Sequence, residues 1–254
     1  MTTALVTGAT AGIGREFATQ LAARGHDLVL VARDTERLEA LAEQLRHDRG
    51  IAVEVLPADL ADRAALTTVA TRIADPDRPV HILVNNAGFG LRQPFLTNDV
   101  ATEENLLDVL CRAVLVLSHA AGRAMRERGH GTIINVSSVA GWVAGGSYSA
   151  AKSWVTVFSE GLATELAGTG VTVTALCPGF TRTEFHERAH LRLDTIPDPF
   201  ILEAPRLVRD ALADADKGRI ISVPGAAYKA LRVVTQLAPR PLVRIGRLGR
   251  KRRP

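Results

Sequence analysis

The sequence has few cysteines, few aromatic residues and no long apolar run, and each scarcity excludes a class of protein. Only two of its 254 residues are cysteine, Cys111 and Cys177. Both lie in apolar runs, which indicates buried free thiols in a reducing compartment rather than a disulfide-held scaffold. No run reaches the roughly 18 uninterrupted apolar residues of a membrane span, since even the stretch 106–125 contains Asp108 and Arg112. The start, MTTALVTG, has no basic region before a long apolar segment, so we expect no secretory signal and a cytoplasmic protein.

Acidic residues are absent from the C-terminal end. Eleven Lys and Arg residues follow Asp216, and no Asp or Glu does. Up to Asp216 there are 20 basic and 27 acidic residues, a net charge of −7, so the overall charge of +4 comes from this end. The end, 226–254, is a basic amphipathic tail that can bind an anionic membrane. Its alternatives are a solvated end that interacts with nothing, an appendage packed on the subunit, and a dimer contact. The body offers no basic face for nucleic acid.

Short apolar runs alternate with amphipathic helical patterns along the rest of the chain. This alternation predicts an α/β fold with one doubly wound, parallel, seven-stranded sheet (a Rossmann fold) and helices on both faces. The predicted strands are 3–7, 28–32, 53–56, 82–85, 132–137, 171–177 and 219–223. The predicted helices are 12–24, 35–48, 63–75, 102–128, 148–167 and 206–215. Residues 1–225 then form one domain, and the least regular stretch, 180–204, is a predicted lid.

A glycine-rich turn joins the first strand to the first helix. It reads Thr7-Gly8-Ala9-Thr10-Ala11-Gly12-Ile13-Gly14. Glycines let the backbone approach a phosphate, and a helix N-terminus favours its negative charge. The spacing, G-x-x-x-G-x-G, differs from the usual dinucleotide fingerprint, G-x-G-x-x-G. By itself the turn is also compatible with a purely structural role.

The end of the second strand bears on the choice of cofactor. An acidic residue there binds a ribose 2′-hydroxyl, whereas an arginine accommodates a 2′-phosphate. Ala32 fills the end and Arg33 follows, which favours NADP(H) over NAD(H). Asp34 is the counter-indication, unless it caps the helix that begins at Thr35. The alternative for Arg33 is an ordinary solvated charge.

One of the two tyrosines has a lysine four residues later. Tyr148 and Lys152 share one face of a predicted helix. A free tyrosine titrates near pH 10, and a nearby cation lowers the pKa and makes acid–base work at neutral pH accessible. Ser138 ends the fifth strand, where sheet ligands bind. Alone, the pair is equally compatible with an exposed helix surface.

Together these segments resemble the short-chain dehydrogenase/reductase family over residues 3–225. The resemblance rests on TGATAGIG at 7–14, Ala58-Asp59-Leu60, Asn85-Asn86-Ala87-Gly88, Asn135-Val136-Ser137-Ser138, YSAAK at 148–152 and Pro178-Gly179 with Thr183. It implies a nicotinamide cofactor and interconversion of alcohols and carbonyls. Tyr148 would be the acid–base group, Lys152 would lower its pKa and hold the ribose, and Ser138 would orient the substrate. The implied cofactor-binding residues are Gly8, Thr10, Gly12, Ile13, Gly14, Arg33, Asp59, Leu60, Asn86, Ala87, Gly88, Tyr148, Lys152, Pro178, Gly179, Thr181 and Thr183.

The chain departs from the family pattern at two points. Leu110 stands where the family has an asparagine of a water-mediated proton relay. Leucine cannot hydrogen-bond water, so either the relay uses other groups or the alignment slips, with Asn105 the nearest asparagine. The ten-residue step from Ser138 to Tyr148 is also short for the family.

A competing motif lies in the predicted lid. His186, Glu187 and His190 match H-E-x-x-H, which on a helix can bind zinc. No histidine follows to complete the ligand set, and Pro197 and Pro199 disfavour a continuous ligand helix. A zinc peptidase is therefore the minor alternative, and we predict no metal site.

The predicted function is an NADPH-dependent carbonyl reductase or alcohol dehydrogenase acting on an apolar ketone or secondary alcohol. The predicted substrate residues are Ser138, Trp142, Tyr148, Phe180 and Phe185, with Phe89, Val143 and Phe200 nearby. The alternative is an NADP-binding sensor or scaffold with little catalysis. We also expect a homo-dimer or homo-tetramer through the helices at 102–128 and 148–167, whose apolar residues include Leu115, Leu117, Trp154 and Phe158.

Overall fold

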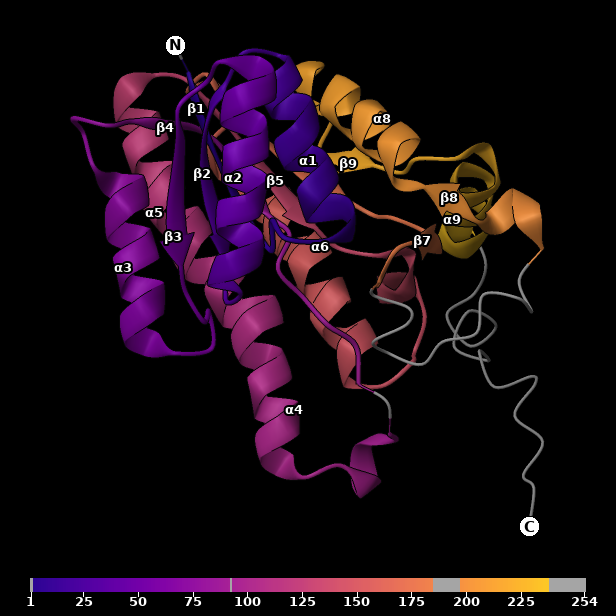
Figure 1. Cartoon of the computed structure of the whole chain (residues 1–254). Coiled ribbons are helices and arrows are strands. Elements are labelled where there is room, and N and C mark those ends of the chain that lie inside the picture. Colours follow the sequence, from indigo (N-terminus) through magenta and orange to yellow (C-terminus); the bar gives the residue numbers. More distant parts are fainter. Residues whose placement is uncertain (1, 92, 185–196, 238–254) are drawn as a thin grey trace.

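The core of the protein is a seven-stranded parallel sheet. The computed structural model describes residues 2–91, 93–184 and 197–237. The strand order is β3-β2-β1-β4-β5-β6-β9, and every neighbouring pair is parallel (Figure 1). The strands are β1 Thr3–Thr7, β2 Asp27–Ala32, β3 Val53–Pro57, β4 Val80–Asn85, β5 Gly131–Val136, β6 Val171–Leu176 and β9 Ile221–Ser222. The predicted Rossmann fold is confirmed, although the last strand is shorter than the predicted 219–223.

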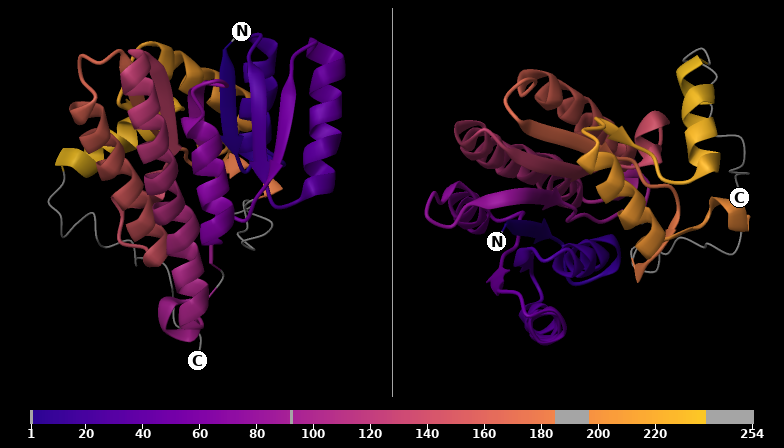
Figure 2. Two further views of the ribbon diagram at one scale, coloured as in Figure 1. Left: turned by 90° about the vertical axis from the view of Figure 1, so that its left-hand side faces the viewer. Right: turned by 90° about the horizontal axis from the view of Figure 1, so that it is seen from above.

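Helices cover both faces of the sheet (Figure 2). One face carries α1 Gly12–Ala23, α2 Thr35–Arg49 and α8 Ala204–Asp216, and the other carries α3 Arg63–Ala74, α5 Ala113–Arg128 and α6 Ser147–Glu165. Successive strand residues point to opposite faces. Val6 therefore packs with Phe17 in one apolar cluster, while Leu5 packs with Leu66 and Leu117 in the other. This double burial explains why strands such as β1 and β2 are mainly apolar.

The predicted helix 102–128 is interrupted by a π-turn. It consists of α4 Val100–Leu107, a π-helical turn at Asp108–Arg112, and α5. In the part of the chain that the structure describes, Val100–Arg128 is the one helix long and apolar enough to cross a membrane by length and composition alone. Its Leu106, Leu110 and Leu117 are fully buried within the protein, as in a core helix. In Figure 1, α4 extends past the lower ends of the strands.

Several short elements at the carboxyl ends of the strands were not predicted. They are η1 Phe95–Thr97, η3 Val139–Trp142, β7 Thr181–Arg182, η5 Asp198–Phe200 and β8 Leu202–Glu203. Strands β7 and β8 form a separate two-stranded sheet, which lies beside α9 Ala226–Leu237 (Figure 1). Helix α9 falls in the basic tail, yet its Tyr228 is buried in a cluster with Cys177 and Val223. The start of the tail therefore packs on the domain.

Candidate active site

The glycine-rich turn is closely packed and leaves a helix N-terminus without a side-chain cap. Gly8 has a positive φ of 65°. A Cβ on Gly14 would lie 2.2 Å from the Gly8 carbonyl oxygen, so only glycine fits there. The N-cap of α1, Ala11, supplies no capping side chain, and the first turn holds no acid. The backbone N–H groups of this turn therefore fit a phosphate. Thr10 is half-buried in the turn, and Ile13 packs partly on the core.

Asn86 fixes this turn to the next strand of the sheet. Its side-chain amide donates to the carbonyl oxygens of Thr7 (2.9 Å) and Gly8 (3.2 Å). The Thr7 hydroxyl in turn accepts from the backbone N–H groups of Asn86 and Ala87. These bonds hold the end of β1 against the end of β4.

Arg33 lies at the surface beside the end of β3. Its guanidinium is 4.0 Å from the carboxylate of Asp59, and 73% of the side chain is exposed. Asp34 accepts a hydrogen bond from the Arg37 backbone N–H at 3.0 Å and so caps α2. The capping interpretation of Asp34 is thereby confirmed, and Arg33 is left facing the solvent at the strand ends. Leu60, by contrast, is buried in the core.

The start of the predicted lid lies across the glycine turn. Thr183 packs on Gly12, where a Cβ would be 3.0 Å from the Thr183 Cβ. Glu184 forms a two-point ion pair with Arg37 of α2, with N–O distances of 3.1 and 3.2 Å. Thr181 is buried and donates to the Gly179 carbonyl. The predicted residues Phe185, His186, Glu187 and His190 lie outside the described residues. Within the described ranges, no group of three His, Cys, Asp or Glu side chains is placed to hold a metal ion.

Ser138 and Tyr148 meet at the carboxyl end of β5. Ser138 caps the 3-10 turn η3, where its hydroxyl accepts from the Ala140 N–H at 3.1 Å. The same side chain is hydrogen-bonded to Tyr148. The ten-residue step between the two residues is therefore long enough to bring them together.

Lys152 lies beneath Tyr148 on α6 and is itself buried, with 5% of its surface exposed. Its ammonium is 5.8 Å from the centre of the Tyr148 ring and donates to the Val136 carbonyl at 2.7 Å. Burial lowers the pKa of Lys152 to about 8. The predicted serine, tyrosine and lysine thus form one cluster.

The pKa of Tyr148 is shifted upward, whereas the sequence led us to expect a downward shift. Burial raises it to about 12, and the Ser138 hydrogen bond acts weakly in the opposite direction. The net shift is therefore opposite to the lowering expected from Lys152, because removal of water disfavours the charged phenolate and favours the neutral phenol.

Leu110 lies in the π-turn and reaches the same cluster. A Cβ on Gly88 would lie 2.8 Å from Leu110 Cδ2 and 3.8 Å from Lys152 Nζ, so the three residues surround one point. Leu110 is fully buried with Leu106 and Ala151. Leu110 therefore places an apolar side chain beside the lysine.

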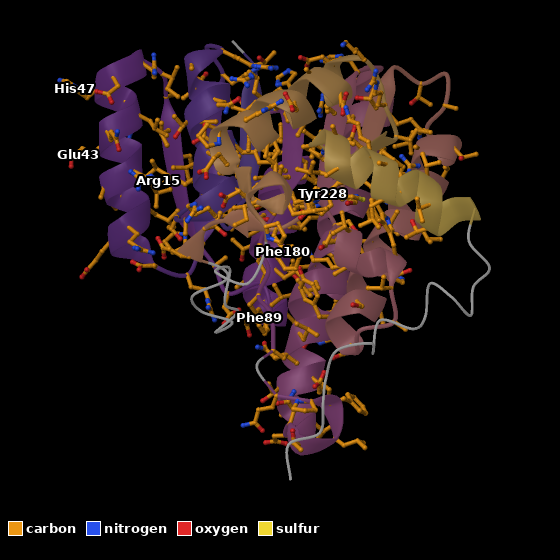
Figure 3. The ribbon with its side chains drawn as sticks, turned by 90° about the vertical axis from the view of Figure 1, so that its right-hand side faces the viewer. Arg15, Glu43, His47, Phe89, Phe180 and Tyr228 are labelled. Carbon is orange, nitrogen blue, oxygen red and sulfur yellow. The ribbon has the colours of Figure 1, made fainter. Side chains whose placement is uncertain are left out.

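Apolar side chains border the serine and the tyrosine. Phe180, Val143 and Phe200 are each 39% exposed. Trp142 packs on the cluster that contains Tyr228, and Phe89 packs on the cluster around Leu110. Figure 3 shows Phe89, Phe180 and Tyr228 along one side of the molecule.

Sequence reasoning missed two residues of this region, Glu103 and Tyr228. Glu103 of α4 is buried, accepts a hydrogen bond from Asn98 at 2.6 Å and another from Ser147, which precedes Tyr148. One signal could have found it, because Glu103 shares a helix face with Leu106 and Leu110. No comparable signal marked Tyr228, whose hydrogen-bond partners Phe180 and Phe200 come from distant parts of the chain.

Comparison with known proteins agrees with this geometry. The family model described as short chain dehydrogenase matches residues 2–193. Sulfoacetaldehyde reductase 2 from Chromohalobacter salexigens is 39% identical over 186 residues, covering 71% of this chain and 73% of that protein. A short-chain dehydrogenase from Sphingobium yanoikuyae in complex with NADPH is 36% identical, with a TM-score of 0.85 over 100% of this chain and 97% of the other. The bulky-bulky ketone specific alcohol dehydrogenase from Comamonas testosteroni is 31% identical, with a TM-score of 0.81 over 100% and 96%.

The fold and the cluster at the strand ends define an oxidoreductase of the Rossmann class. With the family match over most of its length, the chain belongs to the short-chain dehydrogenase family, whose relatives are named as dehydrogenases and reductases acting on alcohol and carbonyl groups.

Proposed function

We propose that the protein is an NADPH-dependent carbonyl reductase that acts on apolar ketones, with Tyr148 as the proton donor. The observation that carries the proposal is the buried cluster of Ser138, Tyr148 and Lys152. A purely structural role would not require a hydrogen-bonded serine and tyrosine to lie next to a buried lysine.

The residues present fit a nicotinamide dinucleotide. The close-packed turn at Gly8 and Gly14 leaves room for a pyrophosphate, and the uncapped start of α1 favours its charge. Arg33 would pair with a 2′-phosphate, which supports NADPH over NADH. The NADPH bound to the relative from Sphingobium yanoikuyae supports the same choice.

The mechanism follows from the two hydroxyl groups. A carbonyl oxygen placed between Ser138 and Tyr148 accepts hydrogen bonds from both. When bound, the nicotinamide supplies the hydride to the carbonyl carbon. Tyr148 donates its proton to the oxygen as negative charge develops there, and Ser138 holds that oxygen in place. The Lys152 ammonium stabilises the phenolate that Tyr148 becomes.

The side chains around the site support the substrate class. The half-exposed Phe180, Val143 and Phe200 offer an apolar wall, and the relative from Comamonas testosteroni is described as specific for bulky ketones.

The test is NADPH oxidation with a panel of apolar ketones, in the wild type and in Tyr148→Phe. We expect turnover to fall at least about a hundredfold, since general acid catalysis contributes roughly 10²–10⁴-fold, while the NADPH dissociation constant stays within about threefold. Full turnover in Tyr148→Phe would refute the assignment. Tight NADPH binding without turnover on any ketone would favour the alternative, a nucleotide-bound sensor.

Cofactor choice is tested by NADPH and NADH titration of Arg33→Ala. Loss of a charged hydrogen bond of about 1.5–3 kcal/mol weakens NADPH binding by about 10–150-fold, and NADH binding stays unchanged. Arg126→Ala is the matched control, because Arg126 is exposed in the last turn of α5. Equal losses for both nucleotides would overturn the role of Arg33.

We further propose a homo-oligomer through the face formed by α4, α5 and α6. Leu107, Leu115 and Val157 are 46%, 45% and 64% exposed there. Next to them, a hollow of 420 Å³ is lined by Leu107, Asp108, Cys111, Arg112, Ala150, Ala151 and Trp154. Leu117, expected on this face, is fully buried in the core and does not contribute. Light scattering of Val157→Asp should show a smaller species than the wild type.

Contact with an anionic membrane is the proposal for the basic tail. Helix α9 exposes Leu231, Val233 and Val234 by 39%, 54% and 60%, and Lys229 and Arg232 stand beside them. We expect the purified protein to co-sediment with vesicles that contain phosphatidylserine and not with vesicles of pure phosphatidylcholine. Equal sedimentation with both would contradict the charge argument.

A further inference from the structure

Tyr228 occupies an unusual place for a residue of the basic tail. It lies in the first turn of α9, only 2% of it is exposed, and it packs with Cys177 and Val223. It is also the only tyrosine besides Tyr148.

The Tyr228 hydroxyl holds two backbone groups that are distant in sequence. It accepts a hydrogen bond from the Phe180 N–H at 3.0 Å and donates one to the Phe200 carbonyl at 2.5 Å. The ring meets Phe200 edge to face, with centres 6.0 Å apart. Phe180 begins the predicted lid and Phe200 lies near its end. One hydroxyl therefore uses both its donor and its acceptor to fix the two ends of the segment.

The ring of Tyr228 also determines which residue fits at position 179. A Cβ on Gly179 would lie 2.0 Å from the ring, so the backbone of Gly179 rests directly on it. The neighbouring Pro178 carbonyl accepts from the Val139 N–H at 3.0 Å. Val139 follows Ser138, which is hydrogen-bonded to Tyr148. Direct contacts thus link α9 to the catalytic serine.

Tyr228 also sets the position of the short second sheet. The Phe180 carbonyl accepts from the Leu202 N–H at 2.8 Å, which closes the pairing of β7 with β8. Phe180 is thus held through its N–H by Tyr228 and through its carbonyl by Leu202. Its ring is partly exposed, and in the view of Figure 3 Phe180 is labelled between Tyr228 and Phe89.

We propose that Tyr228 is a positioning residue for substrate binding, so that α9 contributes to the shape of the substrate site. The hydroxyl anchors Phe180 and Phe200, two aromatic residues near the two ends of the predicted lid, and thereby determines how well the wall fits a bulky apolar ketone. The expected effect on ketone binding rests on the proposed function. The expected effect on the Phe180 backbone rests on the hydrogen bonds alone.

The test compares Tyr228→Phe with the wild type in two measurements. The variant keeps the ring and removes both hydrogen bonds. We expect KM for a bulky ketone to rise at least tenfold, kcat to change less than threefold, and the NADPH dissociation constant to change less than twofold. By hydrogen–deuterium exchange, the Phe180 amide should exchange at least tenfold faster, while amides of β4 and β5 stay unchanged.

The matched control is Thr67→Val on α3. It removes an exposed hydroxyl that also bonds a backbone carbonyl, that of Arg63 at 2.8 Å, and it should alter neither KM nor the Phe180 amide.

Unchanged exchange at Phe180 overturns the anchor itself, whether or not the protein reduces ketones. Faster exchange with unchanged KM in an active enzyme shows a purely structural hydroxyl and overturns the positioning role. A wild type that reduces no ketone refutes the proposed function and with it the kinetic consequence, while the exchange data still decide the anchor.

Discussion

Replacement of Glu103 by alanine should destabilise the protein far more than the same change at the next residue. The buried Glu103 carboxylate accepts hydrogen bonds from Asn98 and Ser147, and it lies in the first turn of α4. Hydrogen bonds to a charged group are worth about 1.5–3 kcal/mol each, and a carboxylate in a first turn adds about 0.3–1 kcal/mol. Because both hydrogen bonds are only partly buried, we take the lower values. We therefore expect the free energy of unfolding to fall by about 3 kcal/mol.

The assay is urea unfolding followed by circular dichroism, with Glu104→Ala as the control. Glu104 is exposed on the same helix, so its removal should cost less than about 0.5 kcal/mol. The midpoint of thermal unfolding of Glu103→Ala should fall by roughly 6–12 °C. Since Ser147 directly precedes Tyr148, turnover should fall as well. Equal stability of the two variants would refute the view that Glu103 anchors the start of α6.

Two further predictions concern the glycine turn and the response to acid. Gly14→Ala places a Cβ against the Gly8 carbonyl and should weaken NADPH binding at least about a hundredfold in a fluorescence titration, whereas Gly161→Ala, with nothing within 4 Å, should bind normally. The Thr3 N–H donates to His81 Nδ1 at 3.1 Å, which requires a neutral ring, and burial with nearby Arg128 lowers the pKa of His81 below its usual 6.5. The unfolded chain therefore takes up a proton first, so this stabilisation is present above pH 6.5 and is lost as the pH falls through the lowered pKa. Urea unfolding at pH 7.5 and 5.5 should show a larger drop for the wild type than for His81→Asn, and identical drops would contradict the role of His81.

The sheet and the position of the site were accessible to sequence reasoning because both depend on local pattern. Strands such as β1 and β2 are mainly apolar, since each face is covered by helices. The glycine turn and the tyrosine–lysine pair have fixed spacings that place them at strand and helix ends. The capping role of Asp34 could be predicted for the same reason, because a helix cap depends on residues only three positions apart.

The remaining features depend on contacts between distant segments. Strands β7 and β8 are only two residues long and are held by Tyr228 from the far end of the chain. The direction of the pKa of Tyr148 was wrong for a similar reason, because spacing reveals a nearby cation but not how completely the phenol is buried. The π-turn around Leu110 has no signature in the helical periodicity, which continues through it.

The strand order also determines when the parts of the site can form during synthesis. The first strand made, β1, lies in the middle of the sheet, with β2 on one side and β4 on the other. On a ribosome that adds about 5–20 residues per second, the glycine turn gains one neighbour early but is secured only when Asn86 emerges. Tyr148 and Lys152 follow much later. The backbone of Phe180 and Phe200 beside them cannot be held until Tyr228 has left the exit tunnel. The half of the sheet that carries the glycine turn is thus assembled well before the half that carries Tyr148 and Lys152.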